Sequence, residues 1–202
     1  MTTTDTYVNR YVREVQQVAR KIDKSSLTRI IDILAELRQN KGRLFFIGVG
    51  GGAGNATHAV NDFRKIAGIE AYTPSDNVSE LTARTNDNGW DSVFADWLKT
   101  SRLAPNDAVF VFSVGGGSEE KSISTNIVAA LKFARQVGAK ILGIVGRDGG
   151  YTAKVADACV VVPTISQDTV TAHTESFQAV LWHLLVSHPR TKVAEMKWES
   201  IK

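Results

Sequence analysis

Histidine and carboxylate side chains at helical spacing are the residues of this 202-residue chain that point most directly to chemistry. His58 and Asp62 are four residues apart, and Glu175 and His183 are eight apart, so each pair would share one face of a helix. Imidazole and carboxylate groups bind divalent metal ions, and they also transfer protons. If the two helices meet, the four side chains predict a metal site or an acid–base pair.

Two glycine-rich turns predict that the chain binds an anion. Residues 48–54 read GVGGGAG and residues 113–118 read SVGGGS, and each turn lies between an apolar run and a helical segment. Glycine lets the backbone approach a ligand closely, and the start of the following helix offers free N–H groups. Two such turns favour a phosphorylated small molecule, although tight turns without a ligand are the alternative. The expected ligand contacts are Gly50, Gly51, Ser113, Val114, Gly115 and Ser118.

Weaker signals stand beside these turns. The polar pair Asn86 and Asp87 could hydrogen-bond sugar hydroxyls or simply form a turn before the next helix. The segment 146–150 (GRDGG) predicts a turn before a helix, with a ligand role as the alternative. His173 and Gln178 are reserve candidates on the late helix. The first glycine turn also approaches the dinucleotide-binding fingerprint, but the acidic residue expected about twenty residues later lies in a poor strand, so a nicotinamide-dependent oxidoreductase is a minor alternative.

To bring these candidate residues together, the fold needs a sheet whose strands all end at the same edge. Short apolar runs predict four buried strands, and a weaker fifth is expected at 69–74. Helical segments alternate with them, which indicates crossover units and a parallel sheet with helices on both faces. We therefore predict an α/β three-layer sandwich in which extra N-terminal helices precede a doubly wound, five-stranded parallel sheet. The strands are expected at 43–50, 108–117, 140–146 and 159–163, and the helices at 6–23, 26–40, 54–67, 91–102, 119–137 and 168–187.

The two N-terminal helices are predicted from apolar residues three and four apart. Ser25 or Ser26 is expected to cap the second of them, and Gly42 to end it. The first has no predicted partner in the sheet, so it is expected to pack against another helix or another subunit. We predict one domain over residues 1–202, with a helical segment at 1–42, an α/β core at 43–187 and a tail at 188–202.

Composition excludes several classes of protein. The chain is 43% hydrophobic and 22% charged, unlike a disordered, collagen-like or disulfide-rich protein. Its apolar runs are too short to span a membrane, and its start lacks a secretory signal pattern. Cys159 is the only cysteine, so no intrachain disulfide can form and a cytoplasmic location is expected. The net charge of +3 is concentrated near the two ends, but no basic run is interleaved with aromatic residues, which disfavours nucleic-acid binding.

The order of these motifs resembles the SIS (sugar isomerase) domain, and more narrowly the phosphoheptose isomerases, over about residues 5–187. In that family a helical segment precedes a flavodoxin-like sheet, and homotetramers carry active sites between subunits. The family reaction converts sedoheptulose 7-phosphate into an aldoheptose 7-phosphate. The resemblance implies the same activity, a sugar-phosphate substrate, a homotetramer and a divalent metal, for which zinc is expected.

The family's metal and proton-transfer positions are matched with changes. Its His-x-x-x-Glu helix corresponds to His58 and Asp62, and its late Gln and His, eight apart, correspond to Glu175 and His183. We expect zinc held by His58, Asp62, Glu175 and His183 to polarise the sugar carbonyl, and Asp62 and His183 to move protons through a cis-enediol. Which of the two is the base stays open, and a ligand role for Asp62 would weaken its role as base.

The family's substrate-binding turns have lost polar side chains in this chain. Its Gly-Asn-Gly-Gly-Ser turn corresponds to residues 48–52, which carry neither the Asn nor the Ser. Its Ser-Thr-Ser-Gly-Asn-Ser turn keeps only the first and last serine, as Ser113 and Ser118, whereas the Asn-Asp pair is retained as Asn86 and Asp87. Because these losses remove hydrogen bonds to substrate, a non-catalytic phosphosugar-binding or protein-interaction module is the alternative function.

Overall fold

The computed structural model describes residues 3–201, which fold around a five-stranded sheet. All strand pairs are parallel, and the order β2-β1-β3-β4-β5 is the doubly wound, flavodoxin-like order that was expected. The strands are β1 (Leu44–Gly48), β2 (Ala71–Tyr72), β3 (Ala108–Ser113), β4 (Lys140–Val145) and β5 (Ala158–Val161). The α-helices are α1 (Thr3–Lys21), α2 (Lys24–Gln39), α3 (Gly51–Lys65), α4 (Val78–Asn88), α5 (Val93–Thr100), α6 (Thr125–Val137), α7 (Gly150–Val155), α8 (Val170–Ser187) and α9 (Lys197–Ser200), and the short 3-10 helices are η1 (Pro74–Asp76) and η2 (Gln167–Thr169).

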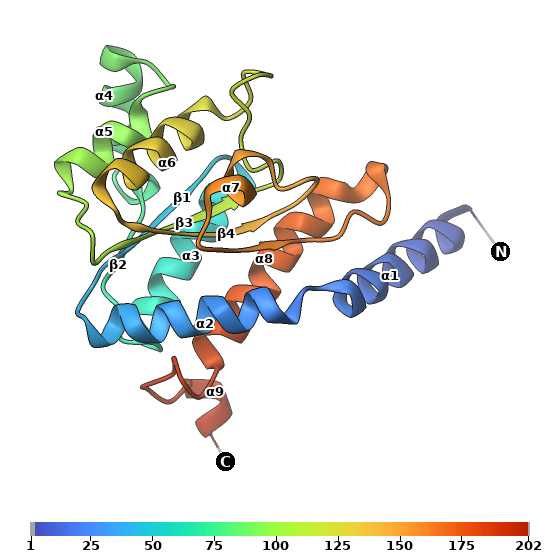
Figure 1. The fold of residues 1–202 in the computed structure, drawn as a ribbon. Helices are drawn as coiled ribbons and strands as arrows, with labels where there is room; N and C mark the ends of the chain where they lie inside the picture. Colours follow the sequence, from blue (N-terminus) through green and yellow to red (C-terminus); the bar gives the residue numbers. More distant parts are fainter. Residues whose placement is uncertain (1–2, 202) are drawn as a thin grey trace.

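Different helices cover the two faces of the sheet, which makes three layers (Figure 1). Phe46 of β1 packs with residues of α2, α3 and α8 on one face, whereas Phe45 and Ile47 pack with residues of α5 and α6 on the other. Successive side chains of a strand point to opposite faces, so a sheet covered on both sides buries every residue of β1. The prediction of a parallel sheet with helices on both faces is confirmed.

The N-terminal helix α1 extends away from the sheet (Figure 1). Its second half is anchored, because Val18 and Ile22 belong to the hydrophobic core. Tyr7, Val8 and Val12 in its first half are each half exposed and form an apolar stripe, which we name the α1 stripe. Neither α1 nor any other helix within residues 3–201 is long and apolar enough to cross a membrane.

The boundaries of α2 differ from the prediction at both ends. Asp23, rather than Ser25 or Ser26, caps its start, because one carboxylate accepts hydrogen bonds from the Ser25 amide and from both serine hydroxyls. The hydrogen bond from the Ser25 hydroxyl, which has the largest effect, and that from the Ser26 hydroxyl lower the pKa of Asp23 to about 2. At the other end the helix stops at Gln39, before Gly42 is reached.

Two other segments also differ from the prediction. α6 begins at Thr125 rather than at 119, and the preceding loop is closed by backbone hydrogen bonds between Ser118 and Ile123. Conversely, Asn86 and Asp87 belong to the last turn of α4, which was not predicted as a helix. Three of its eleven residues, Val78, Leu81 and Ala83, are apolar and none of its residues is buried, so α4 offers too few apolar positions for a helix to be predicted.

Candidate metal centre and anion-binding cleft

Both glycine turns lie at the carboxyl edge of the sheet, where the strand order reverses between β1 and β3. Gly48 ends β1 and Ser113 ends the neighbouring β3, so the turns that follow them start side by side. A Cβ on Gly48 or Gly52 would collide with the carbonyl oxygen of Phe112. Glycine at these positions therefore allows α3 to begin directly against β3.

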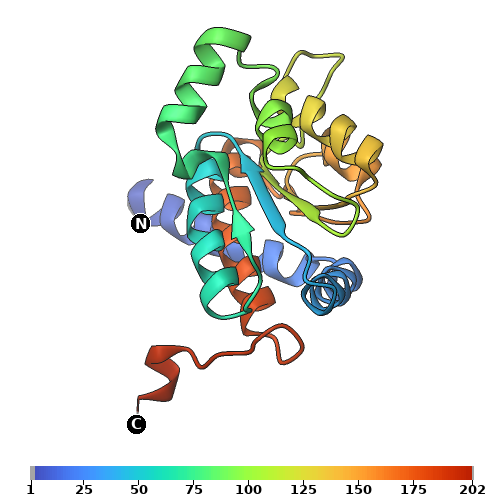
Figure 2. The same cartoon turned by 90° about the vertical axis from the view of Figure 1, so that its left-hand side faces the viewer.

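Three of the four predicted metal ligands meet between α3 and α8, which pack side by side on one face of the sheet (Figure 2). Oδ2 of Asp62 lies 3.6 Å from Nε2 of His58 and 3.4 Å from Nε2 of His183. One ligand atom from each residue lies within 4.8 Å of the other two. We refer to His58, Asp62 and His183 as the triad.

Hydrogen bonds orient the triad so that it can hold a cation. The buried Asp62 accepts a hydrogen bond from Trp182 Nε1 at Oδ2 and one from Asn61 Nδ2 at Oδ1, both at 3.0 Å. Nδ1 of His183 lies 2.8 Å from the carbonyl oxygen of Ala179, which can only accept, so Nδ1 carries the proton. Nε2 then presents its lone pair to the Asp62 carboxylate, and the two atoms repel each other unless a proton or a metal ion lies between them.

Two of the three separations in the triad match those around a tetrahedral metal ion such as zinc. Bonds of about 2.0–2.1 Å in a tetrahedral arrangement place two ligand atoms roughly 3.3–3.4 Å apart. The separations of 3.4 and 3.6 Å between Asp62 and the two imidazoles agree with that value. Because both imidazoles are exposed while Asp62 is buried, the fourth position would face outward, as in catalytic zinc sites with three protein ligands.

Glu175 is not among the residues whose ligand atoms cluster in the triad, so its role as a fourth ligand stays a prediction. Eight residues rise about 12 Å along a helix, so Glu175 and His183 share a face of α8 but lie at different heights. The Glu175 carboxylate lies instead against Gly51 at the start of α3, where a Cβ on that glycine would collide with it.

The second glycine turn lines a cleft of about 870 Å³ at the carboxyl edge of the sheet. The predicted contacts Ser113, Val114, Gly115 and Ser118 all line this cleft. From the first turn only Val49 reaches it, so Gly50 and Gly51 are not among its lining residues. Arg147 of the predicted 146–150 turn also lines it. None of the three triad residues is among the residues that line the cleft.

The second turn is fixed by internal hydrogen bonds. The Gly116 amide donates to Ser113 Oγ at 3.0 Å, and the amides of Tyr151 and Thr152 donate to the carbonyl oxygens of Gly117 and Gly116. A Cβ on Gly116 would collide with the carbonyl oxygen of the neighbouring turn at residue 149. The glycines of this turn therefore allow two loops to pack together, in addition to any ligand role.

Asn86 and Asp87 lie apart from both features. They are exposed at the end of α4, where Nδ2 of Asn86 donates to Oδ1 of Asp87 at 2.8 Å, and neither lines the cleft. The pair is thus not brought to the cleft of its own chain.

The reserve candidates on α8 are buried and hold elements together. Nε2 of His173 lies 2.9 Å from a carboxylate oxygen of Glu14, which also accepts a hydrogen bond from Thr169 at 2.7 Å, so this group joins α1 to the start of α8. Oε1 of Gln178 accepts from Nδ2 of Asn55 at 2.8 Å, which joins α8 to α3. Both residues therefore help to fix the positions of the helices that carry the triad.

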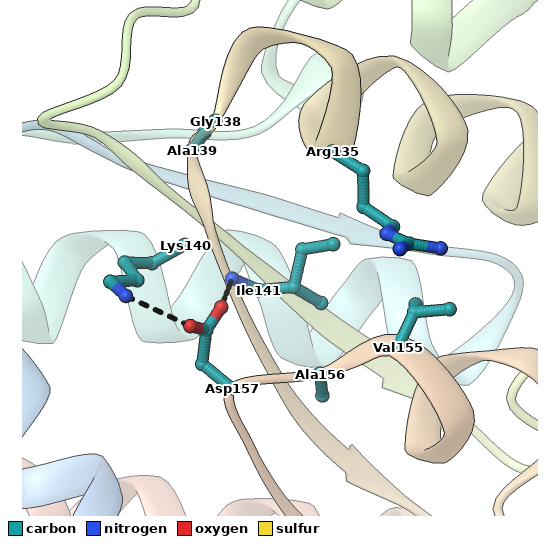
Figure 3. Close-up of a pocket in the computed structure, with 8 residues that line it drawn as sticks. All are labelled: Arg135, Gly138, Ala139, Lys140, Ile141, Val155, Ala156 and Asp157. Atoms are coloured by element: carbon teal, nitrogen blue, oxygen red, sulfur yellow. Dashed lines mark hydrogen bonds and ion pairs between the residues drawn. The ribbon is translucent and has the colours of Figure 1, made fainter.

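A smaller hollow of about 260 Å³ lies at the amino ends of β4 and β5 (Figure 3). Nζ of Lys140 pairs with Oδ1 of Asp157 at 2.9 Å, and Oδ2 of Asp157 accepts from the Ile141 amide at 2.9 Å. These contacts fix the start of β4 against the residue before β5. Open α/β sheets bind ligands at their carboxyl edge, so we assign this hollow a structural role.

Trp182 is the site residue that the sequence did not indicate. Its indole contacts Asp62, which lies 120 positions away in the chain. A tryptophan in an apolar helical segment predicts core packing, and Trp182 is also part of the core. Only the packing of α8 on α3 adds the hydrogen bond.

Comparison with known proteins agrees with these features. The SIS domain family matches residues 6–146. A phosphoheptose isomerase from Helicobacter pylori (strain Shi470) is 31% identical over 144 residues, which cover 69% of this chain and 70% of that protein. The lincomycin biosynthesis protein LmbN from Streptomyces lincolnensis is 30% identical over 148 residues. The match covers 70% of this chain but only 54% of the length of LmbN.

The fold has close structural counterparts as well. The structure of phosphoheptose isomerase GmhA from Neisseria gonorrhoeae matches with a TM-score of 0.78 and 24% identity, covering 92% of this chain and 98% of that chain. This likeness confirms the flavodoxin-like fold. By sequence and by fold, the chain belongs to the SIS domain family and is similar within it to the phosphoheptose isomerases.

Proposed function

We propose that the protein is a sugar-phosphate isomerase that interconverts sedoheptulose 7-phosphate and an aldoheptose 7-phosphate. The observation that carries the proposal is the triad, in which residues from two distant helices converge around a position suited to a cation. A module that only binds a phosphosugar needs a cleft but has no need of clustered metal-binding and proton-transferring groups. The identity of about 30% to phosphoheptose isomerases supports the choice of substrate.

The triad supplies the groups that an aldose–ketose isomerisation needs. The reaction moves one proton between adjacent carbons and one between their oxygens, so it requires a base, an acid and stabilisation of an enediolate. Zinc held by His58, Asp62 and His183 would supply a Lewis acid for the substrate oxygens. We propose Asp62 and His183 as the proton-transferring pair, and a strict ligand role for Asp62 as the competing assignment. Glu175, beside the first glycine turn, is proposed as a contact for sugar hydroxyls.

The phosphate of the substrate is proposed to bind in the cleft. Ser113 and Ser118 offer hydroxyls there, and the backbone at Val114 and Gly115 lines the same wall. Gly50 and Gly51 are proposed to contact the sugar between the cleft and the triad, because their turn lies beside β3 at the same edge of the sheet.

We propose that the protein assembles as a homotetramer with sites between subunits. The α1 stripe leaves Tyr7, Val8 and Val12 half exposed on a helix that extends from the body (Figure 1). Neither the triad nor the Asn86–Asp87 pair lines the cleft of its own chain. A second copy could bring these groups together. Light scattering should show a tetramer, and the double variant V8D/V12D should shift it to smaller species; a monomeric wild type would contradict the assembly.

The proposed compartment is the cytoplasm. The single cysteine, Cys159, excludes an intrachain disulfide. Burial raises the pKa of its thiol to about 12, so it is also a poor nucleophile at neutral pH.

The activity is tested by proton NMR of the purified protein with sedoheptulose 7-phosphate in deuterated water, with and without a chelator. An aldose anomeric signal with deuterium at the adjacent carbon establishes the isomerase, and its loss with chelator assigns the metal a role. Asp62→Ala and His183→Ala should each lower turnover at least about a hundredfold without loss of fold, whereas Asp76→Ala, which removes an exposed carboxylate outside the triad, should not.

The alternative function is a phosphosugar-binding module, which the loss of side-chain hydroxyls at Val114 and Gly115 favours. It predicts a thermal shift on addition of sedoheptulose 7-phosphate without any turnover. Absence of both turnover and shift would remove this sugar as the ligand under either function.

A further inference from the structure

Arg147 occupies a backbone conformation that is unusual for a long side chain. Its φ is 53°, in the left-handed region, within a turn closed by a hydrogen bond of 2.9 Å from the Gly149 amide to the Gly146 carbonyl oxygen. The other left-handed positions of this turn, Gly149 and Gly150, are glycines. Glycine adopts this conformation freely, whereas an L-residue is strained there, and such strain is typical of functional sites.

The Arg147 side chain lies across the second glycine turn. A Cβ built on Gly115 would be 3.8 Å from Cδ of Arg147, which is ordinary van der Waals contact. The side chain thereby lines the cleft together with Ser113 and Ser118. No hydrogen bond or ion pair engages its guanidinium among residues 3–201. The positively charged guanidinium of Arg147 therefore lies at the carboxyl edge of the sheet, with no hydrogen bond or ion pair to another residue among 3–201.

The charged residues that line the cleft include as many acidic as basic groups, and Lys132, which pairs with Glu119 beside the cleft, adds one positive charge. Both carboxylate oxygens of Glu119 bond to Nζ of Lys132, at 2.6 and 2.7 Å, so its charge is compensated. Oδ1 of Asp148 accepts from the Gly150 amide at 3.2 Å and serves the turn. Lys121, Lys154 and Glu120 also line the cleft.

Two backbone donors of the second turn are already engaged. The Gly116 amide is engaged by Ser113 Oγ, and the Ser118 amide donates to the Ile123 carbonyl oxygen at 2.8 Å. Val114 and Gly115 have no hydroxyl groups to offer. A phosphate dianion bound at this turn would therefore need compensating charge from another segment.

We propose that Arg147 binds the phosphate of the substrate directly, with Lys154 adding positive charge from α7. This inference rests on the proposed function, because the anion is taken to be the phosphate of the sugar. A planar guanidinium can donate two parallel hydrogen bonds to phosphate oxygens, which a lysine cannot match. The 146–150 turn, predicted from the sequence mainly as a structural turn, then acts as the charged half of the phosphate site.

The chain provides a matched control for testing Arg147. Arg102 is also left-handed, with φ of 53°, but it follows α5 at the opposite edge of the sheet and does not line the cleft. Arg147→Gly and Arg102→Gly should both raise the Tm, because each relieves the same backbone strain. Only Arg147→Gly should weaken phosphate binding.

The experiment is isothermal titration of the full chain with sedoheptulose 7-phosphate, sedoheptulose and inorganic phosphate at fixed ionic strength. Arg147→Gly should raise the Kd for sedoheptulose 7-phosphate and for inorganic phosphate by about ten- to hundredfold, and it should leave the Kd for sedoheptulose unchanged. Arg102→Gly should bind all three as the wild type does. Added salt should weaken phosphate binding to the wild type more than to Arg147→Gly.

The outcomes separate this inference from the proposed function. Equal phosphate binding by wild type and Arg147→Gly overturns the inference even if turnover is intact. Loss of phosphate binding in Arg147→Gly supports it even if the wild type shows no isomerisation. A wild type that binds neither sedoheptulose 7-phosphate nor inorganic phosphate overturns it as well, and a rise in Tm without a change in Kd assigns Arg147 to the turn alone.

Discussion

Replacing Trp182 by phenylalanine tests whether the hydrogen bond to Asp62 prepares the triad for a metal ion. The indole is 2% exposed, and its Nε1–H donates to Oδ2 of Asp62 at 3.0 Å, the same oxygen that faces His58 and His183. Phenylalanine keeps an aromatic ring in the core but cannot donate. Outer-sphere partners of this kind orient a metal ligand and tune its affinity.

The expected size of the effect follows from these contacts. A hydrogen bond to a charged group contributes about 1.5–3 kcal/mol, and the smaller ring leaves space that adds about 1 kcal/mol. A loss near 3 kcal/mol corresponds to a fall in Tm of about 6–12 °C for a chain of this length. Zinc affinity should fall by roughly ten- to hundredfold, since Asp62 is no longer held in place.

The assay combines thermal unfolding of the metal-free protein with zinc titration against a competing chelator. Trp198→Phe is the control, because Trp198 is 80% exposed on α9 and should leave both the Tm and the zinc Kd unchanged. If Trp182→Phe lowers the Tm without changing the zinc Kd, Trp182 only packs the core. If the wild type does not bind zinc at all, the triad is not a metal centre and its residues act only as acid and base.

Other expected outcomes concern the fold around the site. Gly52→Ala should lower the Tm strongly because the added Cβ would overlap the Phe112 carbonyl oxygen, whereas Gly54→Ala, with nothing within 4 Å of the added carbon, should stabilise α3 by roughly 1 kcal/mol; a similar Tm for both variants would contradict the packing argument. Hydrogen bonds from His173, which has the larger effect, and from Thr169 hold the pKa of Glu14 below its ordinary value of 4.5. Because the folded state has the lower pKa, this group stabilises the fold above about pH 4.5 and loses its contribution as the pH falls through the folded-state pKa. Glu14→Gln should therefore flatten the acid-side fall of the urea midpoint, and a profile parallel to that of the wild type would show that Glu14 is not its source.

The separation of the triad from the cleft shapes how the chain is expected to work. The triad lies along α3 and α8, on one face of the sheet, whereas the cleft is lined by the β3 turn, the following loop and α7. If the triad binds a metal ion and the cleft binds phosphate, as proposed, assembly of copies is one way for both to act on the same substrate. The oligomeric state and the activity therefore belong to the same question.

Local patterns in the sequence were sufficient for the fold. Buried parallel strands appear as short apolar runs because both of their faces are covered, and β1, β3, β4 and β5 were predicted close to their observed bounds. Glycine turns follow β1 and β3 because tight packing at the strand ends excludes a Cβ. By contrast, α4 was missed because it has few apolar residues and buries none of them.

The sequence also determined which residues could serve as ligands, because four-residue spacing places His58 and Asp62 on one face of α3. Tertiary structure decided which of the candidates meet. Glu175 and His183 share a face of α8, but a rise of about 12 Å separates them, and periodicity reports only the direction of a side chain, not its height relative to a neighbouring helix. Trp182 reaches Asp62, and Arg147 reaches the glycine turn, through contacts between segments that are far apart in the chain. Such contacts depend on how helices and loops pack over the sheet, which no local spacing in the sequence encodes.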